Sequence, residues 1–136
     1  MAKSPPKKKP DPRKILLFVW GGGCLLNLAL LFFWYLDGWM EADSFKAGLK
    51  MINAVYAPYL GMMLFFYWAR GKAKRVKRGV PFTLALVAGV VWNGVILSFL
   101  LLLPIEDAVA GITDFAALLS WLVAGAIGYY FARGDA

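Results

Sequence analysis

Four long apolar runs, separated by charged segments, dominate this chain of 136 residues. A bilayer core of about 30 Å needs about 20 apolar residues per helix, and only helices or closed barrels satisfy their backbone groups there. With 61% hydrophobic and 17% charged residues, the rest of the chain could not form a soluble domain. The sequence therefore predicts an all-α integral membrane four-helix bundle over residues 15–136. Its expected spans are residues 15–36, 51–69, 80–103 and 115–132.

The first 14 residues combine four prolines with six Lys or Arg, a composition that cannot bury a core. We expect residues 1–14 to be a flexible cytoplasmic tail. The first apolar run resembles a signal peptide in having a basic flank. Its 22 residues are too many for a signal sequence, however, and no small-residue cleavage site follows Trp34. We expect this run to remain as a membrane anchor.

The basic residues predict the orientation of the spans. Of the 15 Lys and Arg residues, all but Lys46 and Lys50 fall in the N-terminal tail, the loop 70–78 or the C-terminal tail. Because cytoplasmic loops carry the excess of basic residues, both termini and this middle loop are predicted to be cytoplasmic. The same pattern favours the inner membrane of a bacterium. The other two connections are expected to be polar loops, with Thr113 or Asp114 capping the fourth helix.

A weak internal repeat accompanies the four spans. A shift of 66 residues places Asn93 over Asn27 and Gly89 over Gly23. Two parallel helical hairpins related by a pseudo-twofold axis along the membrane normal would explain this match. The alternative is that apolar helices with the same orientation independently favour the same residue types at the same depth. Both interpretations remain open at the level of sequence.

Polar side chains inside the predicted spans are few, and none is ionisable. Asparagine side chains can join membrane helices by hydrogen bonds, and small residues allow those helices to approach closely. Pro58 is expected to kink the second helix. Packing is the favoured interpretation of these residues, and a pore lining is the alternative. The residues predicted to pack helices or to line a pore are Asn27, Asn93, Gly23, Gly89, Pro58 and Ser98.

Several classes of chemistry lack their usual residues. The chain has no histidine and one cysteine, Cys24, so we expect no metal, no cofactor and no catalytic site. The basic loop 70–78 contains no aromatic residue on which a base could stack, which argues against nucleic acid. Anionic lipid headgroups are its expected partners. The residues predicted to contact headgroups are Lys72, Lys74, Arg75, Lys77 and Arg78.

Three hypotheses of function fit these observations, and none of them is an enzyme. The first is an accessory, assembly or structural subunit of a larger inner-membrane complex, acting through contacts with a partner protein or with further copies of itself. The second is an oligomeric ion channel or pore-forming effector. The third is a small transporter that binds a neutral or lipophilic substrate near Pro58.

Overall fold

The computed structural model describes residues 4–7, 10–69 and 79–133. These residues form four helices and no strand, and each helix is long and apolar enough to cross a membrane. The basic loop, and with it the predicted headgroup contacts, lies outside the described residues. The helices are α1 (Pro12–Leu36), α2 (Ala42–Ala69), α3 (Val80–Leu102) and α4 (Ile105–Arg133).

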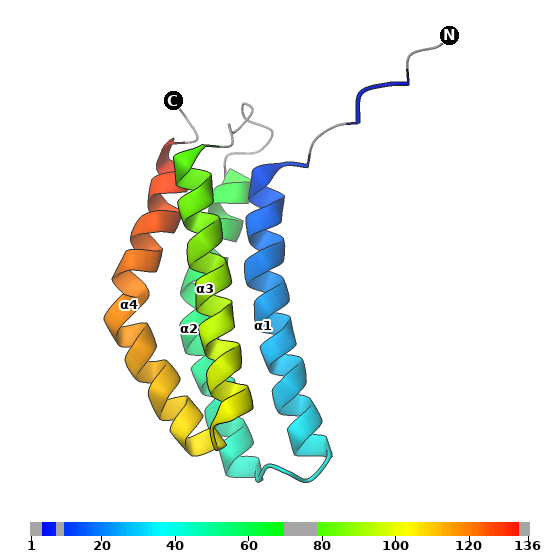
Figure 1. Cartoon of the computed structure of the whole chain (residues 1–136), viewed down its shortest axis with the longest axis vertical. Helices are drawn as coiled ribbons and strands as arrows, with labels where there is room; N and C mark the ends of the chain where they lie inside the picture. The colour runs from blue at the N-terminus through cyan, green and yellow to red at the C-terminus, as the bar shows by residue number, and fades with distance from the viewer. Residues whose placement is uncertain (1–3, 8–9, 70–78, 134–136) are drawn as a thin grey trace.

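The helices alternate in direction and lie side by side along one common axis (Figure 1). Helix α1 packs against α2 and α3, and α4 packs against the same two helices. The pairs α1/α4 and α2/α3 lie on the diagonals. We call the end of the bundle with the connections 37–41 and 103–104 the hairpin end, and the opposite end, where α1 begins, the terminal end.

This arrangement contradicts the predicted pseudo-twofold axis. A twofold axis parallel to the helices would place α1 diagonally opposite α3 and α2 diagonally opposite α4. Each of these pairs instead consists of neighbours. The two hairpins lie side by side, so the axis was wrong, and the duplication itself stays a prediction.

Two helices are longer at the hairpin end than the hydropathy pattern indicated. Helix α2 begins at Ala42 and α4 begins at Ile105. Most residues of the two expected polar loops are therefore helical. Thr113, a predicted N-cap, lies inside α4, where its hydroxyl donates to the Val109 carbonyl at 2.7 Å. The physical reason is that acidic residues in a first turn stabilise a helix N-terminus. These residues are Asp43 in α2 and Glu106 and Asp107 in α4.

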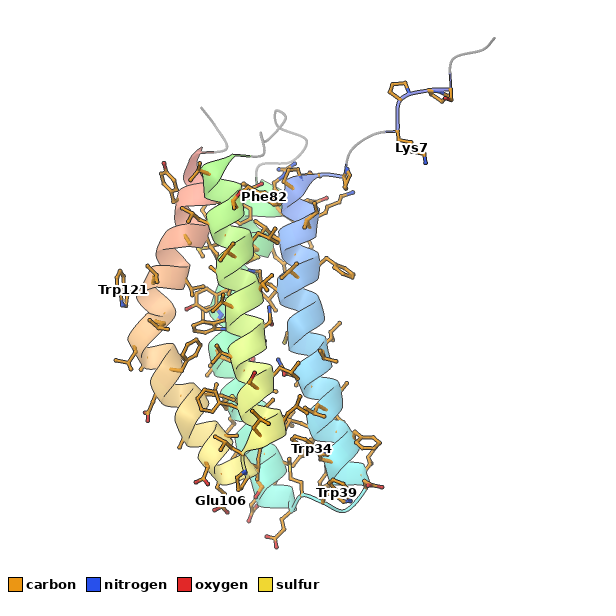
Figure 2. All side chains as sticks on the ribbon, viewed as in Figure 1. Lys7, Trp34, Trp39, Phe82, Glu106 and Trp121 are labelled. Atoms are coloured by element: carbon orange, nitrogen blue, oxygen red, sulfur yellow. The ribbon has the colours of Figure 1, made fainter. Side chains whose placement is uncertain are left out.

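The connections at the hairpin end are short. Gly38 adopts a φ of 78°, which a glycine accommodates without strain, and the Asp37 N–H donates to the Phe33 carbonyl at 3.0 Å. Leu103 and Pro104 alone join α3 to α4. Trp34, Trp39 and Glu106 mark this end in Figure 2.

At the terminal end, α1 begins at Pro12, three residues before the expected span. The Asp11 carboxylate caps the helix by accepting from the Arg13 N–H at 3.0 Å, and it also pairs with the Arg13 guanidinium at 2.9 Å. Partial burial acts to raise the pKa of Asp11, but the hydrogen bonds from Arg13 outweigh it and lower this pKa. The Arg13 guanidinium also lies over the Tyr67 ring, 5.4 Å from its centroid, and so fixes the start of α1 against α2.

Aromatic and aliphatic side chains fill the interior of the bundle. Trp20 of α1 lies 5.1 Å from Tyr59 of α2 and 6.2 Å from Trp92 of α3, measured between ring centroids. Trp92 in turn contacts Phe115 of α4 at 5.2 Å. All four helices therefore meet around one aromatic cluster.

Two glycines permit the close approach of α1 and α3. A Cβ atom on Gly89 would lie 2.7 Å from Nε1 of Trp20, and a Cβ atom on Gly23 would overlap the Asn93 side chain. The two predicted small residues therefore lie in one interface, and each faces a larger side chain of the opposite helix.

We expect Gly89→Ala to destabilise the bundle by about 1–3 kcal/mol, because the buried Trp20 ring has to move. Gly94→Ala, on the same helix, is the matched control, since no atom lies within 4 Å of its added Cβ. The measurement is reversible unfolding in detergent. Equal stability of the two variants would contradict close packing at Gly89.

Candidate functional site

The two predicted asparagines meet at one tyrosine in the middle of the bundle. Asn27 of α1 donates from Nδ2 to the Tyr56 hydroxyl at 2.9 Å. The Tyr56 hydroxyl in turn donates to Oδ1 of Asn93. One hydrogen-bonded chain therefore joins α1, α2 and α3, and it crosses the diagonal between α2 and α3.

Asn93 is also tied to the backbone of two helices. Its Nδ2 donates to the Gly89 carbonyl at 2.8 Å and to the Val19 carbonyl of α1 at 3.4 Å. Asn27 is almost fully buried, and Asn93 is partly buried. Both carboxamides are therefore held in place by neighbouring helices.

Tyr56 was missed in the sequence reasoning, which counted only amide and small hydroxyl side chains as polar. A buried tyrosine hydroxyl usually has a hydrogen-bond partner, so a tyrosine within an apolar run was the available signal. Tyr59 provides a second case. Its hydroxyl donates to the Ser120 carbonyl at 3.1 Å and joins α2 to α4.

Ser98 does not belong to this network. It is exposed on α3, and its hydroxyl donates to the Gly94 carbonyl at 2.7 Å within the same helix. The structure thus brings Asn27, Asn93, Gly23 and Gly89 together and leaves Ser98 on the outer surface.

Pro58 lies on the border of a second feature, a lateral groove between α2 and α4. The groove has a volume of about 510 Å³ and is lined largely by apolar and small side chains. Its lining residues are Met51, Ala54, Val55, Pro58, Tyr59, Trp92, Thr113, Ala116, Ala117, Ser120, Trp121 and Ala124. Proline cannot donate a hydrogen bond to the carbonyl four residues earlier, so the Ala54 carbonyl in the groove has no N–H from Pro58.

Some buried polar atoms near these features have no hydrogen-bond partner in the described part of the chain. They are Oδ1 of Asn27 and the indole nitrogens of Trp20 and Trp92. Trp92 also lines the groove. The Trp92 indole nitrogen itself is buried and is not exposed to the groove.

The described residues contain no group of three His, Cys, Asp or Glu side chains that could hold a metal ion. The chemistry available at the centre of the bundle is hydrogen bonding between neutral groups. At the groove it is the accommodation of apolar groups.

No protein-family model, curated protein or solved structure matches this chain. The class defined by the structure is a helical bundle with four candidate membrane spans.

We expect Tyr56→Phe to lower the stability of the bundle by about 0.5–2 kcal/mol, because it removes the hydroxyl that bridges two asparagines. Tyr35→Phe is the control, because the Tyr35 side chain is exposed at the hairpin end. In a double-mutant cycle, Tyr56→Phe and Asn93→Leu should cost less together than the sum of the single changes, since they remove the same hydrogen bond. Strict additivity would contradict a shared network.

Proposed function

We propose that this protein is an accessory or structural subunit of a larger membrane complex and acts through helix contacts. The observation that carries this proposal is an unequal distribution of charge around the bundle. One side, formed by α1 and α3, carries no charged residue from Ile15 to Leu36 or from Val80 to Leu102. The opposite side, formed by α2 and α4 and called here the α2/α4 face, is charged near the hairpin end.

The α1/α3 side stays apolar to the last turn at the hairpin end. Leu36 at the end of α1 and Leu102 at the end of α3 are both 80% exposed. Such side chains fit lipid chains or another apolar surface. The hydrocarbon layer is therefore expected to cover this side down to the ends of α1 and α3.

Charged residues on the α2/α4 face lie at the same depth. A Cβ atom on Gly48 of α2 would lie 2.9 Å from a Leu31 methyl, and one on Gly111 of α4 would lie 2.6 Å from the Phe99 ring. Lys50 and Asp114 follow these glycines toward the terminal end, and both are exposed. A bilayer that covers Leu36 and Leu102 thus also reaches Lys50 and Asp114.

A charged side chain that faces lipid is costly, by about 2.5–3.5 kcal/mol at the centre of a helix on insertion scales and less near the interface. A partner protein that covers the α2/α4 face would remove this cost. The groove on the same face, lined by alanines, would also let partner helices approach closely. These observations support a protein whose role is to be packed against another membrane protein.

The interior of one protomer gives the pore hypothesis no support. Trp20, Trp92 and Tyr56 are almost fully buried at the level where a polar path would have to run. Asn27 and Asn93 are bonded to Tyr56 instead of lining a channel.

The groove favours one second candidate, the binding of a lipophilic molecule near Pro58. Its volume lies within the range of small-molecule sites, and its lining is largely apolar. A partner helix and a small ligand would compete for the same surface.

Purification of the tagged full-length chain in mild detergent tests the proposed function. We expect it to elute in a complex larger than one protomer, and liposomes that contain it should show no ion flux above empty liposomes. A purely monomeric chain would contradict the proposal. Stabilisation of that monomer by a lipophilic compound, abolished by Ala117→Leu in the groove, would favour the second candidate.

The proposal includes a bacterial inner membrane and cytoplasmic termini, supported by the distribution of basic residues. We expect a reporter that is active only outside the cytoplasm to work when fused after Gly38 or Pro104. The same reporter should be silent when fused after Lys74 or Ala136. The reverse pattern would overturn the orientation and leave the helix contacts unaffected.

A further inference from the structure

The two helices of the α2/α4 face differ in the sign of their net charge near the hairpin end. On the exposed part of α2 near the hairpin end, Lys46 pairs weakly with Asp43 at 3.8 Å, and Lys50 adds a further positive charge. The corresponding part of α4 contains only acidic charges, and none of them forms an ion pair with another described residue. These exposed acids are Glu106, Asp107 and Asp114.

The two helices run in the same direction, and their charges lie at the same level. A Cβ atom on Gly48 would lie 3.7 Å from Cδ1 of Ile105, so these two residues share one level across the α2/α4 contact. Lys50 follows Gly48 by two residues, and Asp107 follows Ile105 by two residues. Lys50 and Asp107 therefore lie at nearly the same depth on neighbouring helices.

On the basis of the proposed function, we infer that the α2/α4 face binds a second copy of this chain. Two copies in the same membrane orientation, related by a twofold axis parallel to the helices, would place α2 of each against α4 of the other. This symmetry brings residues of equal depth together. Lys50 of each copy then lies at the depth of Asp107 of the other copy. The Lys50–Asp107 ion pair therefore forms twice in the dimer.

The exposed residues that follow these charges toward the terminal end fit the same arrangement. On α4, Trp121 follows Asp107 and Asp114 at intervals of seven residues, so the three share one side of the helix, and Trp121 is 71% exposed. It protrudes from the bundle in Figure 2. On α2, Ala57 and Gly61 follow Lys50 on one exposed side, and no atom lies within 4 Å of a Cβ placed on Gly61.

Trp121 lies fourteen residues beyond Asp107, and Gly61 lies eleven residues beyond Lys50. Trp121 of one copy would therefore lie within one turn of Gly61 of the other, where a small residue allows close packing. The interface thus joins opposite charges near the hairpin end with an aromatic side chain against small residues toward the middle of the bundle.

Charge reversal with rescue tests this dimer. The full-length chain is purified in mild detergent, and its mass is measured over a range of protein concentrations. We expect Lys50→Glu and Asp107→Lys each to raise the dimer dissociation constant by about tenfold or more, and the double variant to restore dimerisation. Asp37→Lys, in the α1/α2 connection, is the matched control and should leave the dimer intact.

A second measurement keeps both native charges, in case the reversed variants fail to fold. In a Cys24→Ser background, Ala54→Cys in one tagged copy and Ala110→Cys in a differently tagged copy should form an intermolecular disulfide on mild oxidation. The matched control pairs Ala54→Cys with Ala29→Cys, on the exposed side of α1, and should not cross-link.

The outcomes separate this inference from the proposed function. A dimer that survives both single reversals, or that is lost without rescue by the double variant, overturns the inferred pairing. A complex with a different protein that is lost on Lys50→Glu also overturns it and leaves the subunit role standing. A chain that is monomeric under all conditions, with no copurifying protein, contradicts both proposals.

Discussion

The Tyr56 hydroxyl joins three of the four helices at the centre of the bundle. Tyr56 reaches from α2 across the centre and bonds to Asn27 of α1 and to Asn93 of α3. In an apolar interior, a carboxamide without any hydrogen bond is costly, so the bonds to Tyr56 favour this relative placement of α1, α2 and α3. The bond geometry requires α1 and α3 to lie close together, which Gly23 and Gly89 permit. The aromatic cluster around Trp20 packs against the same three helices.

Hydropathy and charge were sufficient to predict the number and approximate position of the helices, because the bilayer imposes both a length and a composition. They were not sufficient to predict where α2 and α4 begin. Charged residues were interpreted as loop, whereas Asp43, Lys46 and Lys50 occupy one exposed side of a continuous helix. A helix with polar residues on one side and apolar residues on the other remains stable at a membrane boundary.

The candidate site was predicted in part. The shift that aligned Asn27 with Asn93 identified two residues that bond to one hydroxyl, although the proposed symmetry was wrong. The sequence alone does not specify which helices are neighbours, because two hairpins can pack with α1 beside α3 or beside α4. The contact of Tyr56 with Asn93 across the diagonal depends on which of these arrangements forms. It could not be predicted from periodicity alone.

The apolar surface also differs in length between the two sides of the bundle. Along α1 and α3 the apolar surface extends over residues 15–36 and 80–102, and along α2 and α4 over residues 51–68 and 115–131. At a rise of about 1.5 Å per residue, the second pair is shorter by about 6 to 9 Å. An isolated protomer could match a bilayer only by tilting or by thinning the lipid around α2 and α4. A thicker bilayer would increase this mismatch and so favour association at the α2/α4 face, which makes the thickness of the surrounding membrane a physical control on assembly.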